Sequence, residues 1–140
     1  FIEKLESIQP YIIPKEPRTL EQGEYIQSPE EFNKYIQFTS CINCTLCYAA
    51  CPQVGLNPDF IGPGAMALLH RYNMDSRDAG AEQRMALVAS EEGVYNCSAN
   101  GYCSEVCPKH VDPASAVNIN KINAAKDYFL RFLSPKGGSK

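Results

Sequence analysis

The sequence contains no tryptophan, only two histidines and no long run of apolar residues. Two histidines are too few for a histidine-rich metal site. The longest apolar stretches, such as 65–69, are far shorter than the roughly 18 residues that a membrane-spanning helix needs. A net charge of −3 and a pI of about 5.4 argue against a nucleic-acid-binding surface. What remains is a chain of 140 residues, 44% of them apolar, which is enough for one folded domain.

Cysteine is the informative residue type. The sequence has seven cysteines, and all of them fall within two short windows, 41–51 and 97–107. An odd number cannot pair completely into disulfides, and no segment of the sequence resembles a secretory signal. Clustered and reduced cysteines therefore point to metal binding. Because residue 1 is a phenylalanine and not an initiator methionine, we expect the natural start to lie further upstream.

The spacing of apolar residues and turn signals predicts an all-α fold. Three prolines among residues 1–27 predict an irregular arm. Ser28-Pro29 reads as the start of a helix that ends near residue 38, and a short helix is expected over 65–72. Asp112-Pro113 begins a long final helix, which Ser134-Pro135 ends. No alternating strand pattern occurs, and residues after the final helix are predicted to form a flexible tail.

The first cysteine window reads C-x2-C-x2-C-x3-C-P from Cys41 to Pro52. This is the run of bacterial ferredoxins, in which three thiolates hold one iron–sulfur cluster and the fourth cysteine binds the other cluster. Pro52 redirects the chain, so Cys51 is expected to project toward a second site. Thr45 and Tyr48 lie inside the run, where their hydrogen bonds to cluster sulfurs would tune the redox potential, although simple packing is the alternative.

The second window repeats this pattern with one thiolate missing, because Asn100 stands where the matching cysteine would be. Under the crossing rule a complete ligand set for a [4Fe–4S] cluster consists of Cys41, Cys44, Cys47 and Cys107. The remaining set consists of Cys51, Cys97 and Cys103. A cubane corner without a thiolate is easily left empty, so we expect a [3Fe–4S] cluster at this second site.

The cysteines have two alternative uses. Structural zinc sites use sets of four ligands in separated pairs, which fits two overlapping runs and an odd total poorly. A ferredoxin with two [4Fe–4S] clusters stays open if Asn100 or water binds the fourth iron. A small β-rich ferredoxin would have little helix between its two runs, whereas about 45 residues with helical patterns separate the two windows here.

Three stretches carry a resemblance to a known family. They are CINCTLCYAACPQVGLNP with the following FIGP (41–63), HRYNMDSRD (70–78) and GYCSEVCPKHVDP (101–113). Together with PYII in the arm (10–13), they resemble the C-terminal half of fumarate reductase iron–sulfur subunits. The similarity covers essentially the whole chain. Succinate dehydrogenase iron–sulfur subunits share this architecture.

The resemblance implies an α-helical ferredoxin-like domain that carries electrons between an FAD-containing flavoprotein and quinone-binding membrane-anchor subunits. Family members also carry an N-terminal plant-type domain with a [2Fe–2S] cluster in a C-x4-C-x2-C run, and this sequence has no such run. Either the chain is the C-terminal portion of a longer subunit, or the first domain was lost or split off. The start at Phe1 favours a partial chain, so we expect residues 1–27 to be a linker from a missing [2Fe–2S] domain. Residues 28–133 would then bind both remaining clusters, and residues 134–140 would be the tail.

The resemblance also suggests residues near the quinone. Lys121 stands at a position that lies beside the quinone in the family, where an ammonium could hydrogen-bond to a quinone oxygen or protonate it. A solvated lysine, or one paired with a partner's carboxylate, is the alternative. Ser98 could donate to a sulfur or to quinone, or could simply be a turn residue. Leu56 stands where succinate dehydrogenases tend to carry tryptophan, which favours the fumarate reductase branch.

The resemblance thus implies the electron-transfer subunit of a quinol:fumarate reductase that uses menaquinone or ubiquinone. Such a subunit would lie peripherally on the cytoplasmic face of the bacterial inner membrane, attached through the anchor subunits. No substrate-binding catalytic site is expected on this chain, because fumarate or succinate needs a flavin and a pocket on another polypeptide. Nucleic acid is not an expected partner. A succinate dehydrogenase subunit running in reverse, a free dicluster ferredoxin and a zinc-stapled interaction module stay open as alternatives, and a colourless protein would favour the last.

Overall fold

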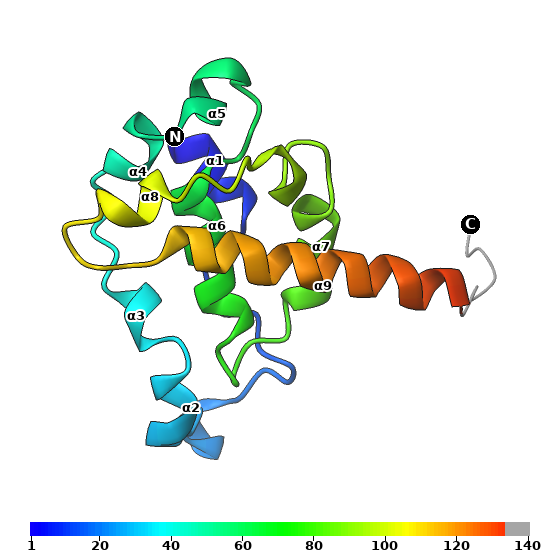
Figure 1. The fold of residues 1–140 in the computed structure, drawn as a ribbon. Helices are drawn as coiled ribbons and strands as arrows, with labels where there is room; N and C mark the ends of the chain where they lie inside the picture. Colours follow the sequence, from blue (N-terminus) through cyan, green and yellow to red (C-terminus); the bar gives the residue numbers. More distant parts are fainter. Residues whose placement is uncertain (134–140) are drawn as a thin grey trace.

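The computed structural model describes residues 1–133, which form an array of helices without a strand in that range (Figure 1). The α-helices are α1 (Ile2–Ser7), α2 (Pro29–Asn33), α3 (Ile36–Thr39), α4 (Leu46–Ala49), α5 (Pro52–Leu56), α6 (Pro63–Asn73), α7 (Ala81–Val88), α8 (Tyr102–Glu105) and α9 (Pro113–Leu133). Two 3-10 helices, η1 (Leu20–Gln22) and η2 (Val94–Asn96), complete them. The predicted all-α class is confirmed. The predicted tail, 134–140, lies outside the described residues.

Helix α6 forms the centre of the fold. It packs against α9, α3, α4 and α7, and nearly every residue in its first two turns is buried. A helix that is apolar around most of its circumference is stable only when it is covered on all sides. The main core that surrounds it is made of ten buried residues: Ile8, Phe60, Ile61, Ala65, Met66, Leu69, Val88, Val94, Val117 and Ala124.

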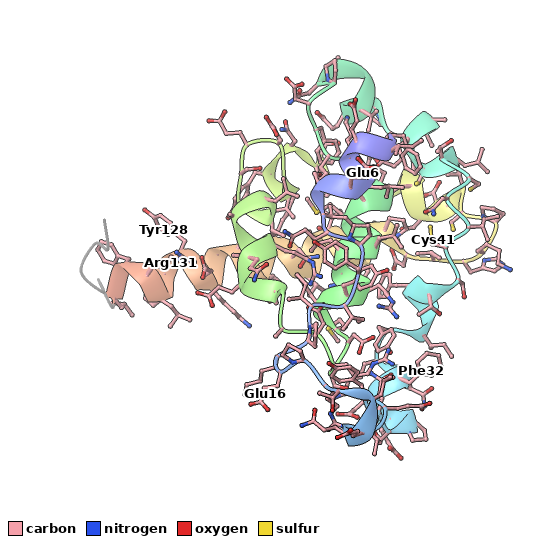
Figure 2. The ribbon with its side chains drawn as sticks, turned by 180° about the vertical axis from the view of Figure 1, so that it is seen from behind. Glu6, Glu16, Phe32, Cys41, Tyr128 and Arg131 are labelled. Carbon is pink, nitrogen blue, oxygen red and sulfur yellow. The ribbon has the colours of Figure 1, made fainter. Side chains whose placement is uncertain are left out.

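Helix α9 packs only along its first half. Its buried residues are Pro113, Ala116, Val117, Asn120 and Ala124, all within the first twelve positions. The remaining turns leave the body of the protein, and Figure 2 shows Tyr128 and Arg131 on this projecting end, far from Cys41. The helix begins at Pro113, as the sequence predicts, and the predicted stop at Ser134-Pro135 lies outside the described residues. Across residues 1–133, no helix combines the length and the hydropathy that crossing a membrane requires.

The N-terminal arm differs from the predicted irregular segment. Residues 2–7 form helix α1, because the first proline of the arm, Pro10, lies beyond that helix and leaves its hydrogen bonds intact. Ile8 follows α1 and is completely buried in the main core. The arm is therefore packed into the same core as the rest of the domain, and only the stretch after Ile8 is mostly irregular apart from η1.

A buried ion pair anchors this arm. The Arg84 guanidinium donates to the Asp78 carboxylate at 2.7 Å, and neither side chain is exposed. The remaining N–H groups of Arg84 donate to the backbone carbonyls of Ile8, Gln9 and Tyr11 at 3.1, 3.2 and 2.9 Å. Asp78 in turn accepts from the backbone N–H of Ile13 at 2.9 Å. Through these hydrogen bonds the ion pair holds the arm backbone against α7 and against the loop that precedes it.

The predicted helix over residues 28–38 is divided in the structure. The predicted capping box is present, since the Ser28 hydroxyl accepts from the Glu31 backbone and the Glu31 carboxylate accepts from the Ser28 backbone. Helix α2 nevertheless ends at Asn33, and Tyr35, with φ −129°, separates it from α3. The Tyr35 ring is buried, and its hydroxyl donates to Gln27 at 2.6 Å, so tertiary burial of this tyrosine overrides the local helical pattern.

A second charged cluster ties α6 to this region. Asp75 accepts from the guanidinium of Arg77 at 2.7 and 2.8 Å and lies 3.4 Å from that of Arg71. Burial alone would raise the pKa of Asp75, but the hydrogen bonds and charge of Arg77 outweigh it and lower that pKa to about 2. The carboxylate is therefore ionised and fully paired at neutral pH. Arg71 also lies over the ring of Tyr35, with 5.0 Å from its Cζ to the ring centroid.

Candidate metal centre

Four of the seven cysteines line one cavity. They are Cys41, Cys44, Cys47 and Cys107. The first three come from the loop before α4 and from α4 itself, and the fourth follows α8; these two helices lie side by side at one end of the fold (Figure 1). The rest of the wall is largely apolar and includes Ala67 of α6 and Val111 before α9. The fold thus brings the two cysteine windows together around a common space.

The loop that carries the first cysteines is bent by left-handed backbone. Asn43 has φ 53° and Thr45 has φ 63°, a region in which asparagine is enriched and bulky residues are rare. Two such residues so close together curl the chain tightly between Cys41 and Cys47. This curl turns three of the four cysteines of the window, Cys41, Cys44 and Cys47, toward one cavity. Pro108 and Lys109 close the opposite side of the cavity after Cys107.

The other three cysteines lie toward the main core or are buried. Cys51 and Cys97 pack against the main core, and Cys103 on α8 is buried with 7% exposure. Burial raises the pKa of the Cys103 thiol, and the proximity of Cys97 and Cys51 raises it further. The thiols of Cys97 and Cys51 therefore lie near that of Cys103. Cys51 is the N-cap of α5 with Pro52 at the first helical position, and Cys97 ends η2.

The donor chemistry of these residues fits iron–sulfur clusters. All seven cysteines are free thiols, and within residues 1–133 no three Cys, His, Asp or Glu side chains converge as ligands of a single ion do. Burial raises the pKa of Cys47 to about 12, and the neighbouring thiols Cys41 and Cys103 add to the shift. Such a thiol stays protonated until a strongly positive group replaces its proton. Proteins typically hold Fe–S clusters with cysteine sulfur donors that line an apolar cavity.

Residue 100, where a fourth thiolate is missing, forms a turn. The Asn100 side-chain oxygen accepts from the Tyr102 backbone N–H at 3.2 Å, and its amide donates to the Ser98 hydroxyl at 3.3 Å. Ser98 is thus engaged within its own loop. Lys121 of α9 lies beside this loop, since its ammonium donates to the Cys97 carbonyl at 2.8 Å. Both residues singled out for quinone contact therefore lie next to Cys97.

Tyr48 does not bind a sulfur through its hydroxyl. The hydroxyl donates to the Ile61 carbonyl at 2.8 Å and accepts from the Ala65 N–H at 3.1 Å. Burial raises the pKa of this phenol, and the thiols of Cys47, Cys41 and Cys51 contribute in the same direction, so it stays neutral. The Thr45 side chain makes no capping bond to α4. The sequence pattern gave no sign that Tyr48 would reach the start of α6.

Comparisons with known proteins agree with these observations. The model of the 4Fe-4S dicluster domain matches residues 37–111. The fumarate reductase iron–sulfur subunit of Escherichia coli O157:H7 is 58% identical over 97% of this chain and 55% of its own length. A mitochondrial succinate dehydrogenase [ubiquinone] iron–sulfur subunit of Oryza sativa subsp. japonica is 36% identical over 86% of this chain and 40% of its own length.

A solved structure supports the fold. The Mycobacterium smegmatis Sdh1 complex in the apo form contains a chain with a TM-score of 0.76 and 25% identity, and the match covers 92% of this chain and 56% of that one. The predicted resemblance to fumarate reductase iron–sulfur subunits is confirmed, and the chain spans about half the length of the curated relatives that it matches. Because the family model covers more than half of its residues, the chain belongs to the 4Fe-4S dicluster domain family.

Proposed function

We propose that this chain is the electron-transfer domain of a quinol:fumarate reductase iron–sulfur subunit, relaying electrons between membrane quinol and an FAD-containing subunit that reduces fumarate to succinate. The observation that carries the proposal is the single cavity lined by cysteines from both windows, Cys41, Cys44 and Cys47 from one and Cys107 from the other. Relatives named fumarate reductase iron–sulfur subunit, at 46–58% identity, support it.

The seven cysteines divide into two ligand sets in this proposal. Cys41, Cys44, Cys47 and Cys107 hold a [4Fe–4S] cluster, and Cys51, Cys97 and Cys103 hold a [3Fe–4S] cluster. The lining of the cavity supports the first set, and the proximity of Cys97 and Cys51 to Cys103 supports the second. Asn100 supports the three-iron assignment, because its side chain is already bonded within a turn.

The residues of this chain hold the clusters, exclude water and fix their surroundings. When bound, the clusters supply one-electron transfer, and the protein sets their potentials through burial and hydrogen bonds. The apolar wall at Ala67 and Val111 keeps water from the four-cysteine cavity. Lys121 presents an ammonium beside Cys97, where it can donate to a quinone oxygen after leaving the Cys97 carbonyl. Quinone, as menaquinone or ubiquinone, would bind at this side of the domain.

The partners follow from the proposed role. A [2Fe–2S] domain upstream of the arm, the flavoprotein and the membrane-anchor subunits complete the complex, which places this chain peripherally on the cytoplasmic face of the bacterial inner membrane. A succinate dehydrogenase subunit running in the opposite direction is the second candidate. The higher identity to fumarate reductase subunits, 58% against 36%, favours the first. Leu56, which is 78% exposed, stands where succinate dehydrogenases tend to carry tryptophan.

Removing one ligand from each set tests the division. Cys51→Ala is expected to lose the three-iron cluster and quinone-dependent turnover while the four-iron cluster largely survives, because Cys51 serves only the second set. Cys44→Ala is the matched variant, with the four-iron cluster lost instead. EPR spectra with iron counts on both variants make the comparison. Full quinol-dependent turnover in Cys51→Ala would overturn the assignment.

A further inference from the structure

The first turn of α6 lacks a cap of its own. Its N-cap residue is Gly62, which has no side chain, and Pro63 follows at the first helical position. The side-chain oxygen of an N-cap residue normally accepts from the N–H of the second or third helical residue. Here the third residue is Ala65, and its N–H donates to the Tyr48 hydroxyl at 3.1 Å. Tyr48 of α4 therefore supplies from a distance the cap that Gly62 cannot provide.

The two glycines at this turn make room for the tyrosine ring. A β-carbon on Gly62, whose φ is +90°, would overlap the ring at Cε1. A β-carbon on Gly64 would stand 2.8 Å from Cε2 and 3.3 Å from the Cys47 sulfur. The ring is thus wedged against the first turn of α6, and the Cys47 sulfur lies beside it. The hydroxyl closes the contact by donating to the Ile61 carbonyl at 2.8 Å.

Tyr48 also stands between the two cysteine sets along the chain. Cys47 precedes it directly, and the Cys51 backbone N–H donates to the Tyr48 carbonyl at 3.1 Å. Tyr48 is therefore linked to Cys47 of the four-cysteine cavity, to Cys51 of the second set and to the central helix α6. Because α6 is the most deeply packed element of the fold, a contact with its first turn holds α4 firmly.

From this geometry we infer that Tyr48 is a positioning residue that fixes the two iron–sulfur sites relative to each other by clamping α4 onto the start of α6. The inference rests on the ligand sets of the proposed function. The hydroxyl holds α4 at the Ile61 carbonyl and the Ala65 N–H, and Cys47 and Cys51 diverge from the clamped turn to their separate sites. Loss of the hydroxyl loosens the spacing between the sites without removing a ligand.

The test compares Tyr48→Phe with Tyr102→Phe in the full chain isolated anaerobically with its clusters. Tyr102 directly precedes Cys103 as Tyr48 directly follows Cys47, but its ring is 51% exposed. EPR of the oxidised protein reports the three-iron cluster alone, whereas the reduced protein has both clusters paramagnetic and reports their magnetic interaction. We expect Tyr48→Phe to change the interaction-broadened signal of the reduced protein and to leave the oxidised signal and the iron count intact. Tyr102→Phe should leave both spectra unchanged.

Hydrogen exchange measured by mass spectrometry gives a second readout that needs no cluster. Within the peptide spanning residues 60–66, the Ala65 amide should exchange about tenfold faster in Tyr48→Phe, because its N–H loses its acceptor. Unchanged exchange together with an unchanged reduced spectrum would overturn the inference. A change in exchange without any spectral change would reduce Tyr48 to a packing residue, which also overturns it.

Two further outcomes of these experiments can be distinguished from each other. If Tyr48→Phe cannot hold its clusters, Gly64→Ala keeps the hydroxyl and presses from α6 on the same ring and, less closely, on the Cys47 sulfur. It should alter the reduced spectrum as well. An unaltered Gly64→Ala spectrum would then contradict the clamp. If the unaltered protein lacks a three-iron signal, the proposed function has failed, whereas the exchange measurement still shows whether the Tyr48 hydroxyl caps α6.

Discussion

Replacing Arg84 with methionine is expected to cost about 4 kcal/mol of folding stability. The guanidinium is buried against the Asp78 carboxylate at 2.7 Å, and breaking such a pair on one side leaves an uncompensated buried charge that costs about 3–5 kcal/mol. Asp78 keeps its bonds from the backbone N–H groups of Ile13 and Gly80, which offsets part of this cost. The three arm carbonyls that lose their donor add to it.

A double variant separates the two contributions. Arg84→Met combined with Asp78→Asn removes the unpaired charge but leaves the carbonyls of Ile8, Gln9 and Tyr11 without their donor. Its stability should therefore lie between that of the unaltered protein and that of the single variant, with a remaining loss of about 2 kcal/mol. A full return to normal stability would mean that the arm carbonyls find other partners.

Thermal unfolding of the cluster-loaded chain, followed by circular dichroism at one fixed heating rate, measures both effects. For a chain of this size each kcal/mol shifts the apparent Tm by about 3–5 °C, so Arg84→Met should lower it by more than about 10 °C. Arg131→Met is the control, because Arg131 and Asp127 form an exposed pair on the projecting end of α9, worth at most about 1 kcal/mol (Figure 2). Equal shifts for the two arginine variants would refute the reasoning.

Two other predictions follow from the site and its support. Asn100→Cys should supply the missing thiolate of the second set and raise the iron content to about eight per chain, with the oxidised EPR signal lost. An unchanged three-iron signal would contradict the role assigned to position 100. Asp75→Asn at pH 7 should cost about 2 kcal/mol, because the pKa of this carboxyl is lowered from 3.8 to about 2. A lowered folded-state pKa contributes stability that is present above about pH 4 and is lost only as the pH falls through about 2. The apparent Tm difference from the unaltered protein should therefore stay constant between pH 5 and 8, and a difference that varied across this range would point to another titrating group.

Local signals predicted much of the helical structure. Asp112-Pro113 begins α9, and Ser28 with Glu31 forms the capping box that starts α2, because capping depends on residues three positions apart. The regular spacing of the cysteines predicts two ligand sets, and this division stays a prediction. The structure shows that Cys107 of the second window lines the same cavity as Cys41, Cys44 and Cys47.

Long-range contacts explain what the sequence did not reveal. Arg84 is only 2% exposed, because backbone carbonyls more than 70 positions away accept from its guanidinium, and no local signal in the sequence indicates such contacts. Tyr35 interrupts a helical pattern because its ring is buried, and no neighbouring residue in the sequence indicates that burial. Tyr48 lies 17 positions before Ala65, whose N–H donates to the Tyr48 hydroxyl and so caps α6. Because this contact is distant in the sequence, the glycines at 62 and 64 indicate only a turn.

Anaerobic EPR of the oxidised protein, with iron and sulfide counted on the same sample, tests the central claim most directly. An oxidised three-iron cluster is paramagnetic, whereas an oxidised low-potential four-iron cluster is silent. The two ligand sets predict a signal of about one spin together with about seven irons per chain. EPR silence with about eight irons would make the protein a ferredoxin with two four-iron clusters and would contradict the proposed fumarate reductase role.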